Sequence, residues 1–139
     1  MTFYHISQKK MRENSTVLKM NNYNLIQKTE NLLESILEKN KPEDKISRQH
    51  SLFVIDDISD YHADNEYIYE VNIVSSENNK SDSAWISEMQ VELDNGNYEA
   101  ANECAKKYWL GEATKNPVWE YRTHMMNVVK EIDKISYNI

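Results

Sequence analysis

The clearest pattern in the chain is an apolar stripe with three- and four-residue spacing between residues 25 and 37. Such spacing gathers apolar side chains on one face of a helix and leaves charged residues on the others. Pro42 follows shortly afterwards and disfavours helical geometry at Lys41, which fits a helix that has already ended. We therefore predict a helix whose apolar face contains Leu25, Ile26, Thr29, Leu32, Leu33, Ile36 and Leu37.

Three segments have the composition or alternation of strands. Residues 3–7 are aromatic and β-branched in character and predict a first strand. Residues 51–55 form an apolar run of strand length, which we interpret as a buried central strand. Residues 67–74 alternate, so that strand should have one core face. The polar stretch 8–24 is interpreted as a loop with a short extended piece at residues 17–18.

The C-terminal half is less regular. Residues 75–81 are polar and predict a mobile loop, and apolar residues at intervals of four then predict a helix over residues 85–93. The next helical stripe covers residues 98–109, and Gly111 sits where a left-handed C-terminal cap is often found. Residues 117–139 permit either a helix or strands, because period alone does not decide between them.

Length and composition indicate one α/β domain spanning residues 1–139. A chain of 139 residues buries enough surface for one stable domain, whereas two would each be marginal. Hydrophobic residues make up 40% and charged residues 28%, a globular balance. Cys104 is the single cysteine, which excludes an internal disulfide and indicates a reducing compartment. With neither a signal peptide nor an apolar run of membrane length, we expect a cytoplasmic protein without a membrane span.

The net charge of −7 bears on the choice of partners. Nucleic acid is disfavoured as the main ligand, because phosphate binding depends on clustered positive charge. An acidic surface suits docking onto a basic protein surface, so a protein target is expected. The oligomeric state is left open.

Several common chemistries lack their usual residues. The histidines and Cys104 show no spacing typical of metal ligands, and no metal site is predicted. The chain has no Gly-flanked serine for a hydrolase nucleophile, and its two glycines exclude a Gly-rich phosphate loop.

Three short motifs occur in order along the chain: Tyr4-His5-Ile6-Ser7, residues 51–56 followed by Tyr61, and Glu120-Tyr121 leading into residues 128–132. Together they resemble the ADP-ribosyltransferase superfamily, in particular its small bacterial and phage members. Tyr4-His5-Ile6-Ser7 is similar to the family's first-strand Tyr/Phe-His-x-Ser/Thr motif. Residues 51–56, followed by Tyr61, resemble the aromatic second-motif strand and the helix after it. Glu120-Tyr121, leading into residues 128–132, resembles the strand that opens with the catalytic glutamate. The resemblance implies an α+β fold with a split, partly open antiparallel sheet flanked by helices.

The resemblance also implies roles in the use of NAD as a substrate. His5 and Ser7 would hydrogen-bond the adenosine ribose and the nicotinamide amide, and Arg48 would pair with the pyrophosphate as a bidentate donor. An aromatic ring would stack on nicotinamide, and Glu120 would stabilise the oxocarbenium-like state as nicotinamide departs. The implied NAD-binding residues are His5, Ser7, Arg48, Ser51, Phe53, Tyr61 and Tyr67, and the implied catalytic residue is Glu120.

Simpler interpretations stand beside these roles. His5 could be an ordinary strand histidine, and Arg48 could form a surface ion pair with Glu43 or Asp44. Phe53 and the tryptophans could be core residues. Glu120 could be an exposed helix residue that pairs with His124.

Two further alternatives concern the acid and the function. Asp82 and Glu88 compete with Glu120 for the acidic role. The alternative function is a non-enzymatic binding protein, such as a phage or mobile-element inhibitor, whose acidic surface occludes a basic site on its partner. It rests on the net charge and on the acidic residues Asp56, Asp57, Asp60 and Asp64.

Overall fold

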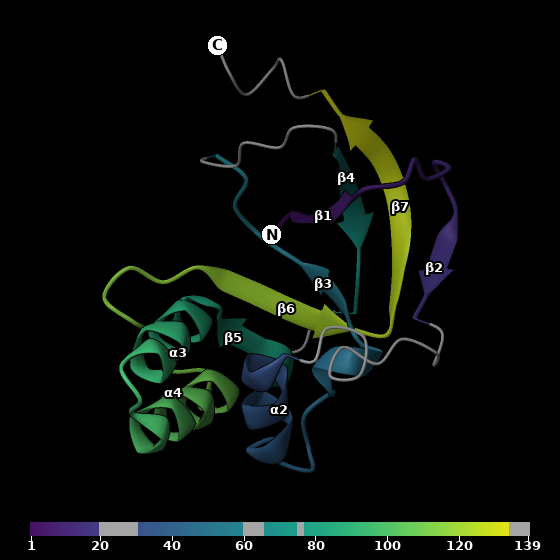
Figure 1. Cartoon of the computed structure of the whole chain (residues 1–139). Helices are drawn as coiled ribbons and strands as arrows, with labels where there is room; N and C mark the ends of the chain where they lie inside the picture. The colour runs from purple at the N-terminus through teal and green to yellow at the C-terminus, as the bar shows by residue number, and fades with distance from the viewer. Residues whose placement is uncertain (20–30, 60–65, 75–76, 134–139) are drawn as a thin grey trace.

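The computed structural model of the chain describes residues 1–19, 31–59, 66–74 and 77–133 (Figure 1). Strands and helices alternate irregularly along this part of the chain, with two short 3₁₀ turns, η1 and η2, between them. In chain order the elements are β1 (Phe3–Ser7), β2 (Thr16–Leu18), α2 (Leu32–Lys39), η1 (Arg48–His50), β3 (Leu52–Val54), β4 (Tyr67–Asn72), η2 (Glu77–Asn79), β5 (Lys80–Asp82), α3 (Ala84–Asp94), α4 (Tyr98–Leu110), β6 (Trp119–Thr123) and β7 (Met125–Ile132).

The strands form two antiparallel sheets. One has the order β1-β4-β7-β2 and the other the order β3-β6-β5. Figure 1 shows α2, α3 and α4 gathered on the side of the three-stranded sheet, away from the curved strand β7. The described chain is therefore a mixed α+β structure with antiparallel sheets, which confirms this coarse part of the predicted fold.

Two connections hold the sheets together. β6 of one sheet continues into β7 of the other, with only His124 between them. At the opposite side, Tyr4 on β1 and Ile55 after β3 exchange backbone hydrogen bonds of 2.8 and 2.9 Å. The edge strand β3 therefore lies beside the edge strand β1.

The first core lies between the sheets and is built from alternate strand residues. The predicted core face of β4 is confirmed, because Tyr69 and Val71 are buried and Tyr67 and Ile73 pack against the same cluster. The buried members of this cluster are Phe3, Val54, Tyr69, Val71, Tyr121, Met126 and Val128.

A second core joins the three helices. Leu37 of α2 is fully buried, and its carbonyl accepts a 2.7 Å hydrogen bond from the indole of Trp109 on α4. Asn31 caps α2 by accepting from Leu33 N at 2.8 Å, as expected for this residue type. No helix in the described residues combines the length and apolar character needed to cross a membrane.

The predictions for the first strand and for the helices hold, with small shifts at the helix ends. β1 has the predicted bounds, and α4 ends at Leu110 and is capped by Gly111, whose φ of 76° is left-handed. α2 ends at Lys39, two residues after the last apolar residue of the predicted stripe, and residues 25–30 of the predicted helix lie outside the described residues.

Two predictions for the strand regions need correction, and one segment that the sequence left open is now assigned. β3 is the edge strand of its sheet rather than a central strand, because β6 occupies the centre. Residues 80 and 81, the end of the predicted loop 75–81, form β5 together with Asp82, and Ser81 and Asp82 are buried with hydrogen-bond partners. The ambiguous segment after residue 117 forms β6 and β7.

Burial of α2 predicts the effect of shortening its leucines. Leu37→Ala should lower the free energy of unfolding by about 2–5 kcal/mol, because it removes fully buried methyl groups and leaves a cavity. Leu32→Ala on the same helix is the matched control. Because Leu32 is 50% exposed, this substitution should lower the free energy of unfolding much less. Urea denaturation measures both, and equal losses would show that α2 does not dock as described.

Candidate functional site

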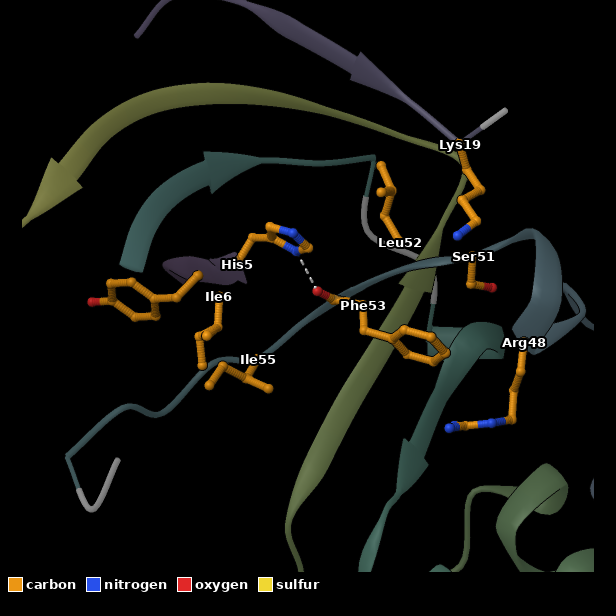
Figure 2. A pocket seen from close by; sticks show the side chains of 9 residues that line it. His5, Ile6, Lys19, Arg48, Ser51, Leu52, Phe53 and Ile55 are labelled. Atoms are coloured by element: carbon orange, nitrogen blue, oxygen red, sulfur yellow. Dashed lines mark hydrogen bonds between the residues drawn. The ribbon is translucent and has the colours of Figure 1, made fainter. Parts of the chain in front are cut away.

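A hollow of about 380 Å³ lies where β1 passes the edge strand β3 (Figure 2). The bridge between Tyr4 and Ile55 explains how residues so far apart in the chain meet there. Four of the residues implied to bind NAD lie in its wall: His5, Arg48, Ser51 and Phe53. The remaining lining residues are Tyr4, Ile6, Lys19, Leu52 and Ile55.

His5 is held in one orientation by the backbone of β3. Its Nδ1 lies 2.8 Å from the carbonyl oxygen of Phe53, as the dashed line in Figure 2 shows. Because a carbonyl only accepts, Nδ1 carries the proton and the neutral ring keeps Nε2 as an acceptor. Burial lowers the pKa of His5, and the hydrogen bond to Phe53 offsets this only in part. His5 is therefore a neutral hydrogen-bond acceptor at neutral pH.

Ser51 and Phe53 have defined partners in the wall. Ser51 is buried in the wall of the hollow, and its hydroxyl donates to Ser47 O at 2.7 Å. The guanidinium of Arg48 lies 4.7 Å from the centre of the Phe53 ring. One face of that ring is thus already covered by a cation.

Arg48 is the centre of a buried ion-pair network. Its Nε donates to Glu34 of α2 at 3.0 Å, and its Nη1 donates to Glu120 of β6 at 2.7 Å. The same Nη1 donates to the hydroxyl of Tyr108 on α4 at 2.7 Å. Burial alone would lower the pKa of Arg48, but Tyr108, Glu120 and Glu34 outweigh it and raise the pKa above its usual value. The guanidinium therefore stays charged.

Glu120 is anchored through one of its two oxygens. Oε1 accepts from Arg48 and, at 2.5 Å, from the Tyr108 hydroxyl. Burial and the charge of Glu120 raise the pKa of Tyr108, which keeps its proton available for this bond. No hydrogen bond within the described residues uses Oε2, so this oxygen can accept from a ligand.

Arg122 extends the network behind Glu120. These residues are two apart on β6 and therefore share the face of the strand that meets the helices. Nη1 of Arg122 donates to Ser81 Oγ at 2.8 Å and to Tyr108 at 3.0 Å, while the guanidinium lies 4.7 Å from the Trp109 ring. The sequence patterns did not predict Arg122, Tyr108 or Glu34 as members of this network, although the two-residue spacing of Glu120 and Arg122 was a usable signal.

The remaining predicted site residues are not brought to this hollow. Ser7 and Tyr67 face each other across β1 and β4, and Tyr67 lines a separate hollow with Glu131. Ser7 forms a local turn with Lys9. Tyr61 lies outside the described residues.

Asp82 and Glu88 are poor candidates for the acidic role. Asp82 is fully buried and accepts from the backbone N–H groups of Thr114 and Val118 at 2.6 and 2.8 Å, and of Ala84 at 3.0 Å. Burial alone would raise the pKa of Asp82, but these hydrogen bonds outweigh it and lower the pKa. Glu88 is exposed on α3. Asp82 therefore has a structural role, whereas Glu120 is bound directly to Arg48, which lines the hollow.

Two of the simpler interpretations are wrong. Arg48 does not pair with Glu43 or Asp44 at the surface, because its partners are Glu34 and Glu120 in a nearly buried network. Glu120 is a strand residue rather than an exposed helix residue, and its side chain is 14% exposed. Both the partners of Arg48 and the burial of Glu120 follow from the position of β6 as the central strand under the helices.

The described residues contain no cluster of three or more histidine, cysteine or carboxylate side chains that could hold a metal ion. Comparison of the chain with protein-family models, with curated proteins and with solved structures found no match.

The buried network predicts a large cost for removing its cation. Arg48→Ala should lower the free energy of unfolding by about 3–5 kcal/mol, because Glu34 and Glu120 would be left as nearly buried charges without the cation that neutralises them. Arg12→Ala, at an exposed position, is the matched control and should change stability little. Urea denaturation measures the free energy of unfolding of both variants.

A triple variant separates charge from packing. Glu34→Gln, Arg48→Met and Glu120→Gln together remove every charge of the ion pairs. The triple variant should therefore lose less free energy of unfolding than Arg48→Ala does. A loss as large as that of Arg48→Ala alone would indicate that the contacts, rather than the charges, are responsible.

The lowered pKa of His5 predicts that the stability of the chain depends on pH. Since its pKa is lowered in the folded chain, the unfolded chain binds the proton more tightly, and the free energy of unfolding should fall as pH falls below about 6.5. His5→Asn removes this titration while keeping a donor to Phe53 O. Urea denaturation at about pH 7.5 and 5.5 should show a larger loss for the parent chain than for His5→Asn. Parallel losses would exclude His5 as the source.

Proposed function

We propose that the chain is an ADP-ribosyltransferase that uses NAD as its substrate and modifies a macromolecular target, and that its fold is of the ADP-ribosyltransferase type. One observation carries the proposal. His5, Ser51 and Phe53 line one hollow, and Glu120 is bound directly to Arg48 in the wall of that hollow. This grouping combines residues from the three sequence motifs that resemble the family.

The wall of the hollow suits a nucleoside. Neutral His5 offers Nε2 to a ribose hydroxyl, and Ser51 offers its oxygen as a further acceptor. Phe53 provides aromatic surface beside the apolar residues Leu52 and Ile55. The volume of about 380 Å³ is within the usual range of about 300–1,000 Å³ for small-ligand sites. It fits the nicotinamide riboside portion of NAD better than the whole molecule.

The pyrophosphate contact in this proposal moves from Arg48 to Lys19. The donors of Arg48 are directed at Glu34, Glu120 and Tyr108, so its fork is not presented to a ligand. Lys19 also lines the hollow, and Figure 2 shows its ammonium group reaching toward Ser51. A lysine would meet the phosphates as a point charge.

The chemistry assigned to Glu120 is electrostatic. The bond between C1′ of the nicotinamide ribose and the ring nitrogen breaks, and nicotinamide departs neutral with the electron pair. A nucleophile on the target then bonds to C1′ and loses its proton to solvent. Glu120 Oε2 would accept from a ribose hydroxyl and stabilise the positive charge that develops at C1′. Because Arg48 and Tyr108 fix the carboxylate, little reorganisation would be needed in the transition state.

A non-enzymatic acidic binding protein is the second candidate. The observation in its favour is that Arg48 and Glu120 neutralise each other, as they would in a purely structural network. The net charge of −7 is compatible with a basic partner in either case.

Release of nicotinamide from NAD tests the transferase proposal. The parent chain, with cell lysate as a source of target, should release nicotinamide and transfer labelled ADP-ribose. Glu120→Gln should lower kcat by about 10²-fold or more, because the lost charge acts mainly in the transition state. Lys19→Gln should mainly raise KM, since it would weaken binding of NAD in the ground state.

Glu88→Gln removes an exposed carboxylate from α3 and is the control for a general loss of charge. Melting curves for each variant separate loss of turnover from loss of fold. The proposal fails if the folded parent chain neither releases nicotinamide nor transfers label, and Glu120 loses its role if Glu120→Gln keeps full turnover.

A further inference from the structure

A second hollow, of about 410 Å³, adjoins the first. The two share Ile6 and Ile55, the residues beside the bridge that joins β1 to the end of β3. Its other lining residues come from the turn after β3 and from the approach to β6: Asp56, Asp57, Pro117, Val118 and Trp119.

The second hollow combines apolar surface with two carboxylates. Val118 is 56% exposed, so it presents its side chain to solvent rather than to a core. Asp57 accepts from the amide and hydroxyl of Ser59 at 2.9 and 2.6 Å. These two bonds lower the pKa of Asp57, which keeps its carboxylate charged at neutral pH. Asp56 lies beside it and accepts from the Tyr121 hydroxyl at 3.2 Å.

The apolar wall of this hollow is built on a buried anchor. Asp82 holds the loop after α4 through its bonds to Thr114 N and Val118 N, at 2.6 and 2.8 Å. Ser83 adds a backbone hydrogen bond to Val118 O at 2.8 Å. Pro117 and Val118 are therefore held in place before any partner arrives, which reduces the ordering cost of binding.

We infer that the second hollow docks the protein target, taking a lysine or arginine side chain that is flanked by an apolar residue. This inference rests on the proposed function, because it assigns to the target the surface next to the NAD hollow. The apolar stem of such a side chain would lie on Ile6, Ile55 and Val118, and its charged end would meet Asp56 and Asp57. The same carboxylates would repel a nucleic acid, which makes a protein the fitting target.

Peptide binding tests the inference without NAD. A fluorescein-labelled peptide with one arginine between two leucines should bind the full chain at about 50 mM salt, measured by fluorescence anisotropy. The same peptide with citrulline keeps the shape and lacks the charge, and should bind about tenfold more weakly. The double variant Asp56→Asn with Asp57→Asn should weaken binding of the arginine peptide to a similar degree. Asparagine keeps an acceptor for Ser59 and Tyr121.

Two variants control for charge and fold. Glu99→Gln with Glu103→Gln removes two charges from α4, which contributes nothing to the second hollow, and should leave peptide binding unchanged. Val118→Ala shortens an exposed side chain and should weaken binding several-fold with an unchanged melting curve. Equal effects of the two charge-removing variants would overturn the inference, because binding would then follow net charge alone.

The remaining outcomes separate this inference from the proposed function. Equal binding of the arginine and citrulline peptides would overturn the cationic preference, as would self-association of the chain through this hollow. Label transfer by the parent chain together with no peptide binding would overturn the docking site while leaving the transferase intact. Peptide binding without any nicotinamide release would show that the second hollow binds basic segments. It would overturn the inference that this hollow docks the target of a transferase.

Discussion

The arrangement of the described chain depends on one buried cation. Arg48 is the first residue of the turn η1 before β3, and it binds Glu34 on α2 and Glu120 on β6, while Tyr108 on α4 contacts both Arg48 and Glu120. Bringing three charges out of water is costly unless every one has a partner, so these elements must reach their positions together. The network thus couples the helices to the central strand, in addition to the apolar contacts between them.

β6 makes this coupling possible because its two faces have different environments. Tyr121 points into the apolar core between the sheets, whereas Glu120 and Arg122 point at the helices. The strand alternation therefore separates a charged layer from an apolar one within five residues. A carboxylate in that layer is rigid and shielded from water, which suits it equally to structural and to electrostatic work.

Local patterns predicted local structure well, and long-range partners could not be read from them. The bounds of β1 and the left-handed cap at Gly111 follow from strand composition and glycine geometry. β5 was missed because its residues are polar, and their burial depends on partners such as Arg122. The nearest acids to Arg48 in the sequence are Glu43 and Asp44, whereas its actual partners lie 14 and 72 residues away. Four of the eight residues implied for the site, His5, Arg48, Ser51 and Phe53, do meet in one hollow.

The position of both hollows follows from how the two sheets are joined. Neighbouring strands within a sheet pair along their length through backbone hydrogen bonds, whereas β1 and the end of β3 are joined by the isolated bridge between Tyr4 and Ile55. The residues on either side of that bridge cannot pair further, so space opens on both flanks and Ile6 and Ile55 border each hollow. Polar groups line both flanks, with His5 and Lys19 in the first hollow and Asp57 in the second. A split between antiparallel sheets is therefore the place in this fold where two different ligands can lie side by side, one beside Glu120 and one beside the acidic turn.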